Sequence, residues 1–93
     1  MLTFISQLET IIENRKEKLP EGSYTTTLFK AGLDRILRKI GEESGELIIA
    51  GKNQNKTEIA NEAADLLFHI LVLLHNEGLS LKDVEEVLKN RHE

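Results

Sequence analysis

The sequence lacks cysteine and tryptophan, and it contains one proline, one tyrosine and three phenylalanines. Without cysteine, neither a disulfide framework nor a thiolate metal site can stabilise the fold. The most apolar stretch, residues 66–74, has about half the length that spans a bilayer. The amino-terminal residues lack the basic start and long apolar run of a signal peptide. These absences predict a cytoplasmic protein without a membrane-spanning segment.

Basic residues are also scarce, with 12 Lys and Arg against 16 Asp and Glu and a net charge of −4. No basic face large enough for general nucleic-acid binding can form from this set, so we expect no nucleic-acid partner. An acidic protein still binds a polyphosphate when divalent cations lie between the two sets of negative charge. Composition alone leaves that possibility open.

The length of 93 residues accommodates a single domain, residues 1–93. A chain this short buries only about two-thirds of its unfolded surface, so a monomer would be marginally stable. Oligomerisation or a bound metal is the usual compensation in small proteins.

Helical periodicity runs through nearly the whole chain, without a strand signal or an internal repeat. The hydroxyl-rich segment 23–27 is the exception, since its residues favour caps and turns. The expected elements are a helix ending at Pro20 and Gly22, a short helical turn over 28–31, and helices over 33–52, from Asn55 or Thr57 to Asn76, and after Ser80. The fold class is therefore all-α, with four to five helices.

The expected helix that ends at Asn76 is apolar around nearly its whole circumference between residues 59 and 74. Such a helix must be buried nearly all round, and three neighbours in one short chain barely suffice. We therefore expect a helical bundle completed by dimerisation, as a homodimer or higher homo-oligomer. In the last helix, the residues expected to face inward are Leu81, Val84, Val87 and Leu88.

Acidic residues are arranged in a pattern on two of the expected helices. In the helix over 33–52, Glu43 and Glu46 project within roughly 60° of each other, and Glu42 lies a little further round. The next helix carries a single polar stripe on an otherwise apolar cylinder, formed by Glu58, Glu62, Asp65, His69 and Asn76. A narrow stripe flanked by leucine and isoleucine is unlike an ordinary solvated face.

Partly buried carboxylates require a partner, because uncompensated desolvation costs several kcal/mol. Two helices that each offer acids at i and i+3 supply four oxygen-bearing ligands across one groove. Oxygen ligands without His or Cys suit Mg²⁺, with Mn²⁺ as an alternative. The opposing interpretation is that a Glu-x-x-Glu pair is simply a solvated acidic face, and the residues alone leave both open.

The acidic pattern and its surroundings resemble a known family. Glu42, Glu43 and Glu46 followed by Glu62 and Asp65 match the EExxE…ExxD signature of the all-α NTP pyrophosphohydrolases, the MazG-like superfamily. Further segments resemble the phosphoribosyl-ATP pyrophosphatases of histidine biosynthesis: Ser23-Tyr24-Thr25, residues 32–37, Lys39, residues 48–50 and residues 62–67. The resemblance covers nearly the whole chain, from about Leu2 to His92.

This resemblance implies that Glu43, Glu46, Glu62 and Asp65 bind magnesium, and that Glu42 assists as a water-positioning or supporting group. It also implies hydrolysis of 1-(5-phosphoribosyl)-ATP to 1-(5-phosphoribosyl)-AMP and pyrophosphate. Magnesium chemistry of this kind needs no nucleophilic side chain, because the cation activates water and the protein positions it.

Lys39 and the Tyr24-Thr25 pair each have two interpretations. Lys39 either contacts a phosphate of the substrate or forms an i,i+4 ion pair with Glu43. Tyr24 and Thr25 either hold the ribose or base of the substrate, or cap the next helix and pack the loop.

The histidines are weaker candidates. His69 falls on the acidic stripe, but a lone histidine on an apolar helix is more often a hydrogen-bonded core residue than a metal ligand. His75 and His92 carry no functional signal in the sequence.

Two alternatives to the phosphoribosyl-ATP reaction remain at this stage. The same acids would serve a house-cleaning (d)NTP pyrophosphohydrolase, because they act on the phosphates alone. A non-catalytic helical dimerisation module with an incidental acidic groove is the alternative from a different class.

Overall fold

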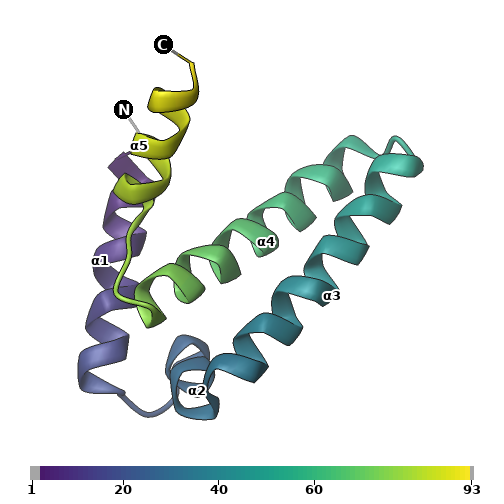
Figure 1. Ribbon diagram of the computed structural model, residues 1–93. Coiled ribbons are helices and arrows are strands. Elements are labelled where there is room, and N and C mark those ends of the chain that lie inside the picture. Colours follow the sequence, from purple (N-terminus) through teal and green to yellow (C-terminus); the bar gives the residue numbers. More distant parts are fainter. Residues whose placement is uncertain (1–2, 93) are drawn as a thin grey trace.

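The computed structural model describes residues 3–92 and consists of five helices (Figure 1). They are α1 (Thr3–Lys18), α2 (Tyr24–Ala31), α3 (Leu33–Lys52), α4 (Lys56–Asn76) and α5 (Leu81–Arg91). No strand occurs within these residues, which confirms the all-α prediction. No helix in the described part of the chain is both long and apolar enough to cross a membrane.

The helix boundaries follow from local chemistry. The Asn55 side chain accepts a hydrogen bond from the Glu58 amide at 3.1 Å and caps α4, so Asn55 and not Thr57 is the cap of the two that the sequence offered. At α5, Ser80 and Asp83 form a capping box in which the Ser80 amide donates to Asp83 at 2.9 Å. Gly78 takes a positive φ of 77°, which allows the chain to leave α4 and turn toward α5.

The second helix is longer than the sequence predicted. Segment 23–27 was expected to be poor helix material that supplies caps, with a short helical turn over 28–31, but α2 begins at Tyr24. Ser23 is its cap and accepts from the Thr26 amide at 3.2 Å. Thr25 and Thr26 are buried in its first turn, so capping and tertiary packing override the weak helix propensity of threonine.

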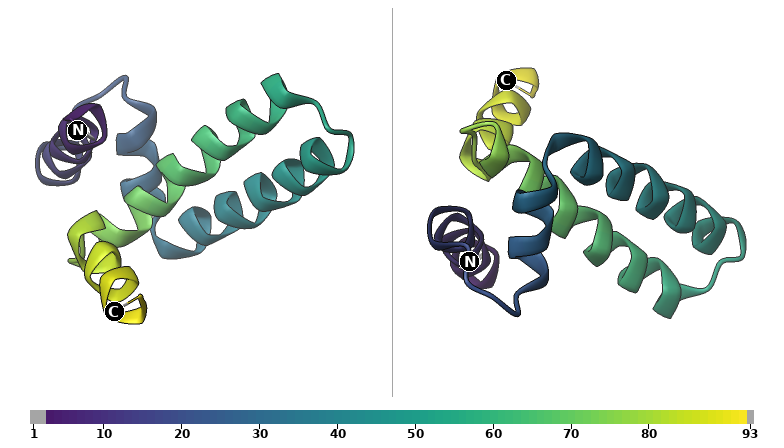
Figure 2. Two further views of the ribbon diagram at one scale, coloured as in Figure 1. Left: turned by 90° about the horizontal axis from the view of Figure 1, so that it is seen from above. Right: turned by 90° about the horizontal axis from the view of Figure 1, so that it is seen from below.

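An antiparallel pair, α3 and α4, forms an arm that projects away from the other helices (Figures 1 and 2). At the base of this arm, α1 and α2 pack against α4, and α2 also packs against α3. The fully buried side chains gather there, and they are Ile12, Leu28, Ile36, Leu71 and Val72. The outer half of the arm is therefore only two helices thick.

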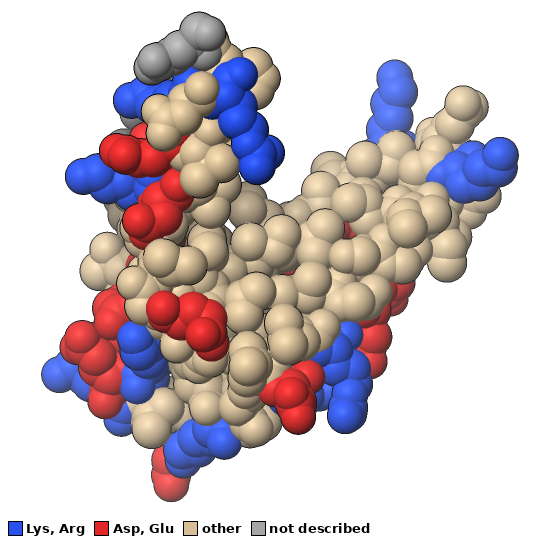
Figure 3. All heavy atoms as spheres, in the orientation of Figure 1, with Lys and Arg blue, Asp and Glu red and all other residues tan. Residues whose placement is uncertain are grey.

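Several large apolar side chains are exposed to solvent in a single copy of the chain. Ile48 of α3 is 70% exposed and Ile49 is 63% exposed. The face of the arm seen in Figure 3 carries few charged side chains except at its tip and lower edge. The expectation that α4 is buried all round does not hold within a single chain, because Ala60, Ala63 and Ala64 are exposed.

The prediction that Val87 and Leu88 face the interior was wrong. Val87 and Leu88 of α5 are about half exposed, at 47% and 50%. The cause is the position of α5, which leaves the end of α4 and has no helix packed along its length within residues 3–92. Leu81 and Val84, nearer its start, are partly buried as predicted.

Candidate metal centre between α3 and α4

Three carboxylates converge where α3 and α4 pack together. Glu43 of α3 and Glu62 and Asp65 of α4 each offer an oxygen, and these atoms lie within 4.8 Å of one another. Glu43 is only 6% exposed, Glu62 is partly buried and Asp65 is exposed. The group therefore runs from the interior of the helix pair to its surface. Three of the four residues that the sequence assigned to a metal come together here.

Two oxygens of this group are buried without a hydrogen-bond partner. They are Glu43 Oε2 and Glu62 Oε1. An unsatisfied buried carboxylate oxygen is costly, since it loses its hydration without compensation. A divalent cation that prefers oxygen ligands would satisfy both atoms at once. The donor set of this structure therefore fits such an ion.

Mutual repulsion acts on the carboxylate at the centre of the group. Burial raises the pKa of Glu62, and the negative charges of Glu46, Asp65, Glu43 and Glu58 raise it further. The direction of this shift shows that Glu62 holds its charge at a free-energy cost in the chain by itself. A cation placed among these acids would reverse that cost.

Glu46 lies outside the close group of three, one turn further along α3. It lines a hollow of about 190 Å³ with Glu62, at the end of the arm where α3 leads into α4. The other residues around this hollow are Ile49, Ala50, Asn53, Asn55 and Glu58. Glu46 is exposed, so its side chain is free to approach the group from the solvent side.

Glu42 faces Lys39 instead of the three acids. The Lys39 ammonium lies 3.2 Å from Glu42 Oε1 and 3.6 Å from Glu43 Oε1. The hydrogen bond to Glu42 raises the pKa of Lys39, with smaller contributions from Tyr24 and Glu43 and an opposing effect of burial. The i,i+4 pairing with Glu43 is thus present, and Lys39 is the basic group beside the acids.

Tyr24 is linked to the acidic site through His69. The Nδ1 atom of His69 lies 2.7 Å from the Asp65 carbonyl oxygen, and its Nε2 lies 2.9 Å from the Tyr24 hydroxyl. His69 is 5% exposed, so the prediction of a hydrogen-bonded core histidine is confirmed. The Tyr24 ring stacks on Phe68, with centroids 6.2 Å apart. Thr25 is buried in α2, as the packing interpretation expected.

The sequence missed two features of this region. The Tyr24 contact with Phe68 and His69 joins residues far apart in the chain, and no local pattern indicates it. The i,i+4 spacing of Asp65 and His69 was visible, but it did not show that the histidine binds the backbone. His75 was given no role, yet it is buried and contacts carboxylates of α1.

The fold and the site define an all-α protein with a candidate site for a hard divalent cation between two antiparallel helices. Residues 5–92 match the family described as phosphoribosyl-ATP pyrophosphohydrolase. The chain belongs to this family.

Individual relatives agree with this assignment. The chain is 52% identical over 91 residues to the "Phosphoribosyl-ATP pyrophosphatase" of Leptospira biflexa, covering 98% of this chain and 99% of that protein. It is 47% identical to the protein of the same name from Clostridium acetobutylicum, over 96% of this chain and 81% of the relative. It is also 53% identical to the "Histidine biosynthesis bifunctional protein HisIE" of Bacillus subtilis over 95% of this chain. The chain spans 42% of the length of that bifunctional relative.

Proposed function

We propose that this chain, as a single domain, hydrolyses phosphoribosyl-ATP to phosphoribosyl-AMP and pyrophosphate, a step of histidine biosynthesis. The observation that carries the proposal is the group formed by Glu43, Glu62 and Asp65, with its two unsatisfied buried oxygens, in a member of this family. The names of the Leptospira and Clostridium relatives supply the substrate.

The acids would hold Mg²⁺, with Mn²⁺ as an alternative of the same ligand preference. Glu43, Glu62 and Asp65 would bind it directly, and Glu46 would approach from the next turn of α3. When bound, the cation neutralises phosphate charge and makes a water molecule more acidic. Glu42 contacts Lys39, which also contacts Glu43, and it would orient the attacking water either directly or through Lys39.

The remaining side chains would position the substrate. Lys39 lies between Glu42 and Glu43. A small movement of its side chain would bring the ammonium group to a phosphate oxygen of a bound substrate. Tyr24 is 48% exposed, and its hydroxyl is oriented by the buried His69. The Asp65 carbonyl only accepts, so His69 Nδ1 carries a proton there. In the neutral ring Nε2 then accepts from Tyr24, and the phenol oxygen is left to accept from a hydroxyl or amine of the nucleoside.

A homodimer would complete this fold. Ile48, Ile49 and the alanines of α4 are exposed on the two-helix arm, and a second copy packed on them would remove this apolar surface from water. The substrate would then lie beside the interface, because the acids are on the same two helices.

A pyrophosphate-release assay tests the proposal. Phosphoribosyl-ATP is compared with common NTPs and dNTPs, with and without Mg²⁺, for the wild type, Glu62→Gln and the matched control Glu86→Gln on exposed α5. We expect magnesium-dependent release from phosphoribosyl-ATP that Glu62→Gln abolishes and Glu86→Gln leaves unchanged. Preference for a dNTP would indicate the house-cleaning activity. No release from any nucleotide would indicate a non-catalytic module.

A further inference from the structure

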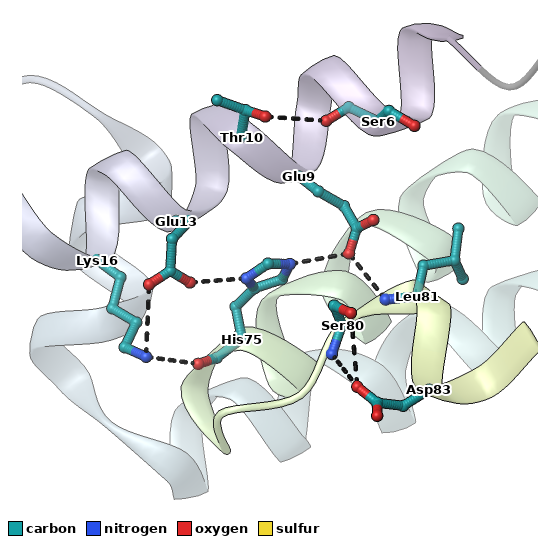
Figure 4. A network of polar contacts seen from close by, with 9 residues as sticks. All are labelled: Ser6, Glu9, Thr10, Glu13, Lys16, His75, Ser80, Leu81 and Asp83. Carbon is teal, nitrogen blue, oxygen red and sulfur yellow. Dashed lines mark hydrogen bonds and ion pairs between the residues drawn. The ribbon is translucent and has the colours of Figure 1, made fainter. Parts of the chain in front are cut away.

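His75 lies between two glutamates at the junction of α1, α4 and α5 (Figure 4). Its Nδ1 is 2.8 Å from Glu13 Oε1, and its Nε2 is 2.8 Å from Glu9 Oε1. The ring is buried, with the residue 8% exposed. None of these residues belongs to the acidic site between α3 and α4.

The number of protons in this arrangement follows from its geometry. An ionised carboxylate oxygen only accepts hydrogen bonds, whereas a neutral imidazole has one N–H donor. Two ionised glutamates at 2.8 Å therefore require both ring nitrogens to carry a proton. The alternative is a neutral ring beside a protonated glutamate.

The surroundings favour the doubly protonated ring. The hydrogen bond from His75 lowers the pKa of Glu13, as does the charge of Lys16, although burial opposes the shift. Glu9 Oε1 also accepts from the Leu81 amide at 2.9 Å, so this oxygen acts as a hydrogen-bond acceptor. Both glutamates are therefore ionised near neutral pH, and the ring supplies the two donors.

The same atoms connect three helices. Glu9 Oε1 joins the ring of His75, near the end of α4, to the first residue of α5. On the α1 side, the Lys16 ammonium binds the His75 carbonyl oxygen at 2.9 Å and lies 3.8 Å from Glu13. No helix packs along α5 in the described residues, so its start is held by the Glu9 bond together with the packing of Leu81 on the core.

We propose that His75 is a doubly protonated latch at this junction, and that loss of its ring proton releases α5. A ring with one N–H donates to one glutamate and presents a lone pair to the other. Ring nitrogen and carboxylate oxygen would then repel each other, and Glu9 would move away together with the Leu81 amide.

Other charged groups near the junction do not supply the missing donor. Lys16 is on the opposite side of the ring, where it binds the His75 carbonyl and Glu13. From the α5 side, Asp83 is engaged with Ser80, whereas Lys82 and Glu85 line a hollow of about 270 Å³ that they share with Glu9. Glu77, at the end of α4, contacts Asn76. The ring proton of His75 thus controls the contact.

Nitrogen-15 NMR of the wild-type protein tests the protonation state directly. At about pH 7 an exposed imidazole is mostly neutral. We expect both ring nitrogens of His75 to carry protons at this pH, and the exposed His92 is recorded in the same spectrum for comparison. A single protonated nitrogen on His75 would overturn the proposal, whatever the behaviour of any variant.

Hydrogen exchange tests the consequence for α5. His75→Gln has one amide donor group and no charge. In this variant the exchange rate of the α5 backbone amides should increase about ten- to hundredfold at pH 6. The wild type should show the same increase as the pH rises from about 6 to 9, after correction for intrinsic exchange, and His75→Gln should show none. His92→Gln is the matched control and should behave as the wild type. Equal α5 protection in the wild type and His75→Gln, or wild-type protection independent of pH, would contradict the latch.

Discussion

Replacing Glu43 by Gln should stabilise the fold when Mg²⁺ is absent. Glu43 is the most buried acid of the group, and its Oε2 has no hydrogen-bond partner. An isosteric amide removes the charge and keeps the volume, so packing between α3 and α4 is preserved. Most substitutions at buried positions destabilise a protein, and a gain here would be evidence that the native residue serves a ligand.

The expected magnitude follows from the charges around Glu43. Oxygens of Glu62 and Asp65 lie within 4.8 Å, and the only attractive neighbour among the charged contacts of residues 3–92 is Lys39 at 3.6 Å. With an effective dielectric constant between about 20 and 80, two repulsions exceed one attraction by roughly 0.5–2.5 kcal/mol. For a domain of this size, 1 kcal/mol corresponds to about 4–8 °C in Tm. We therefore expect Tm to rise by several degrees.

Thermal melts at neutral pH, with and without Mg²⁺, measure this effect. The wild type should gain stability from Mg²⁺ and Glu43→Gln should gain little. The difference in Tm between the two proteins should therefore narrow or change sign as the metal is added. Glu42→Gln is the matched control: it removes a half-exposed carboxylate that pairs with Lys39 and lies outside the group of three acids, so it should change Tm little. A lower Tm for metal-free Glu43→Gln, or a metal-induced shift as large as that of the wild type, would refute the reasoning.

The remaining predictions concern pH, ligand linkage and assembly. The folded-state pKa of Glu62 is raised, so protonated Glu62 contributes to the free energy of unfolding below about pH 4.3, and this contribution is lost as the pH rises through the folded-state pKa. The Tm of Glu62→Gln should therefore match that of the wild type near pH 4 and exceed it at pH 7. A non-hydrolysable triphosphate analogue should hardly shift Tm alone, but it should shift Tm most together with Mg²⁺; an equal shift without metal would mean that basic groups such as Lys39 hold the phosphates. In sedimentation, Ile48→Lys should dissociate a dimer without unfolding the chain, since Ile48 is 70% exposed on one copy, whereas a monomeric wild type at micromolar concentration would contradict the proposed interface. Val72→Asp should unfold the protein by circular dichroism, because this residue is fully buried.

Helices were predictable because their signals are local. The periodicity of α3, the cap at Asn55 (one of two positions that the sequence offered) and the helix start after Ser80 depend on residues within one or two turns, and the structure has all three. The start of α2 was not predictable in this way. Its threonines favour other conformations, and burial against α1 and α4 decides the outcome.

The two histidines of α4 show what cannot be predicted from residue spacing along a helix. His69 and His75 both lie on α4, but the Tyr24 contact of His69 comes from 45 positions away and the two ring contacts of His75 come from 62 and 66 positions away. One ring lies against a backbone carbonyl and a phenol hydroxyl beside the acids. The other faces two carboxylates and requires a second proton. Spacing along a helix shows which residues share a face, whereas the charge of a side chain depends on what that face meets in the folded chain. For the acidic site these two kinds of information agree, because α3 and α4 each carry their acids at helical spacing and pack directly against each other. At the His75 junction the carboxylates come from α1, which no pattern within α4 can indicate.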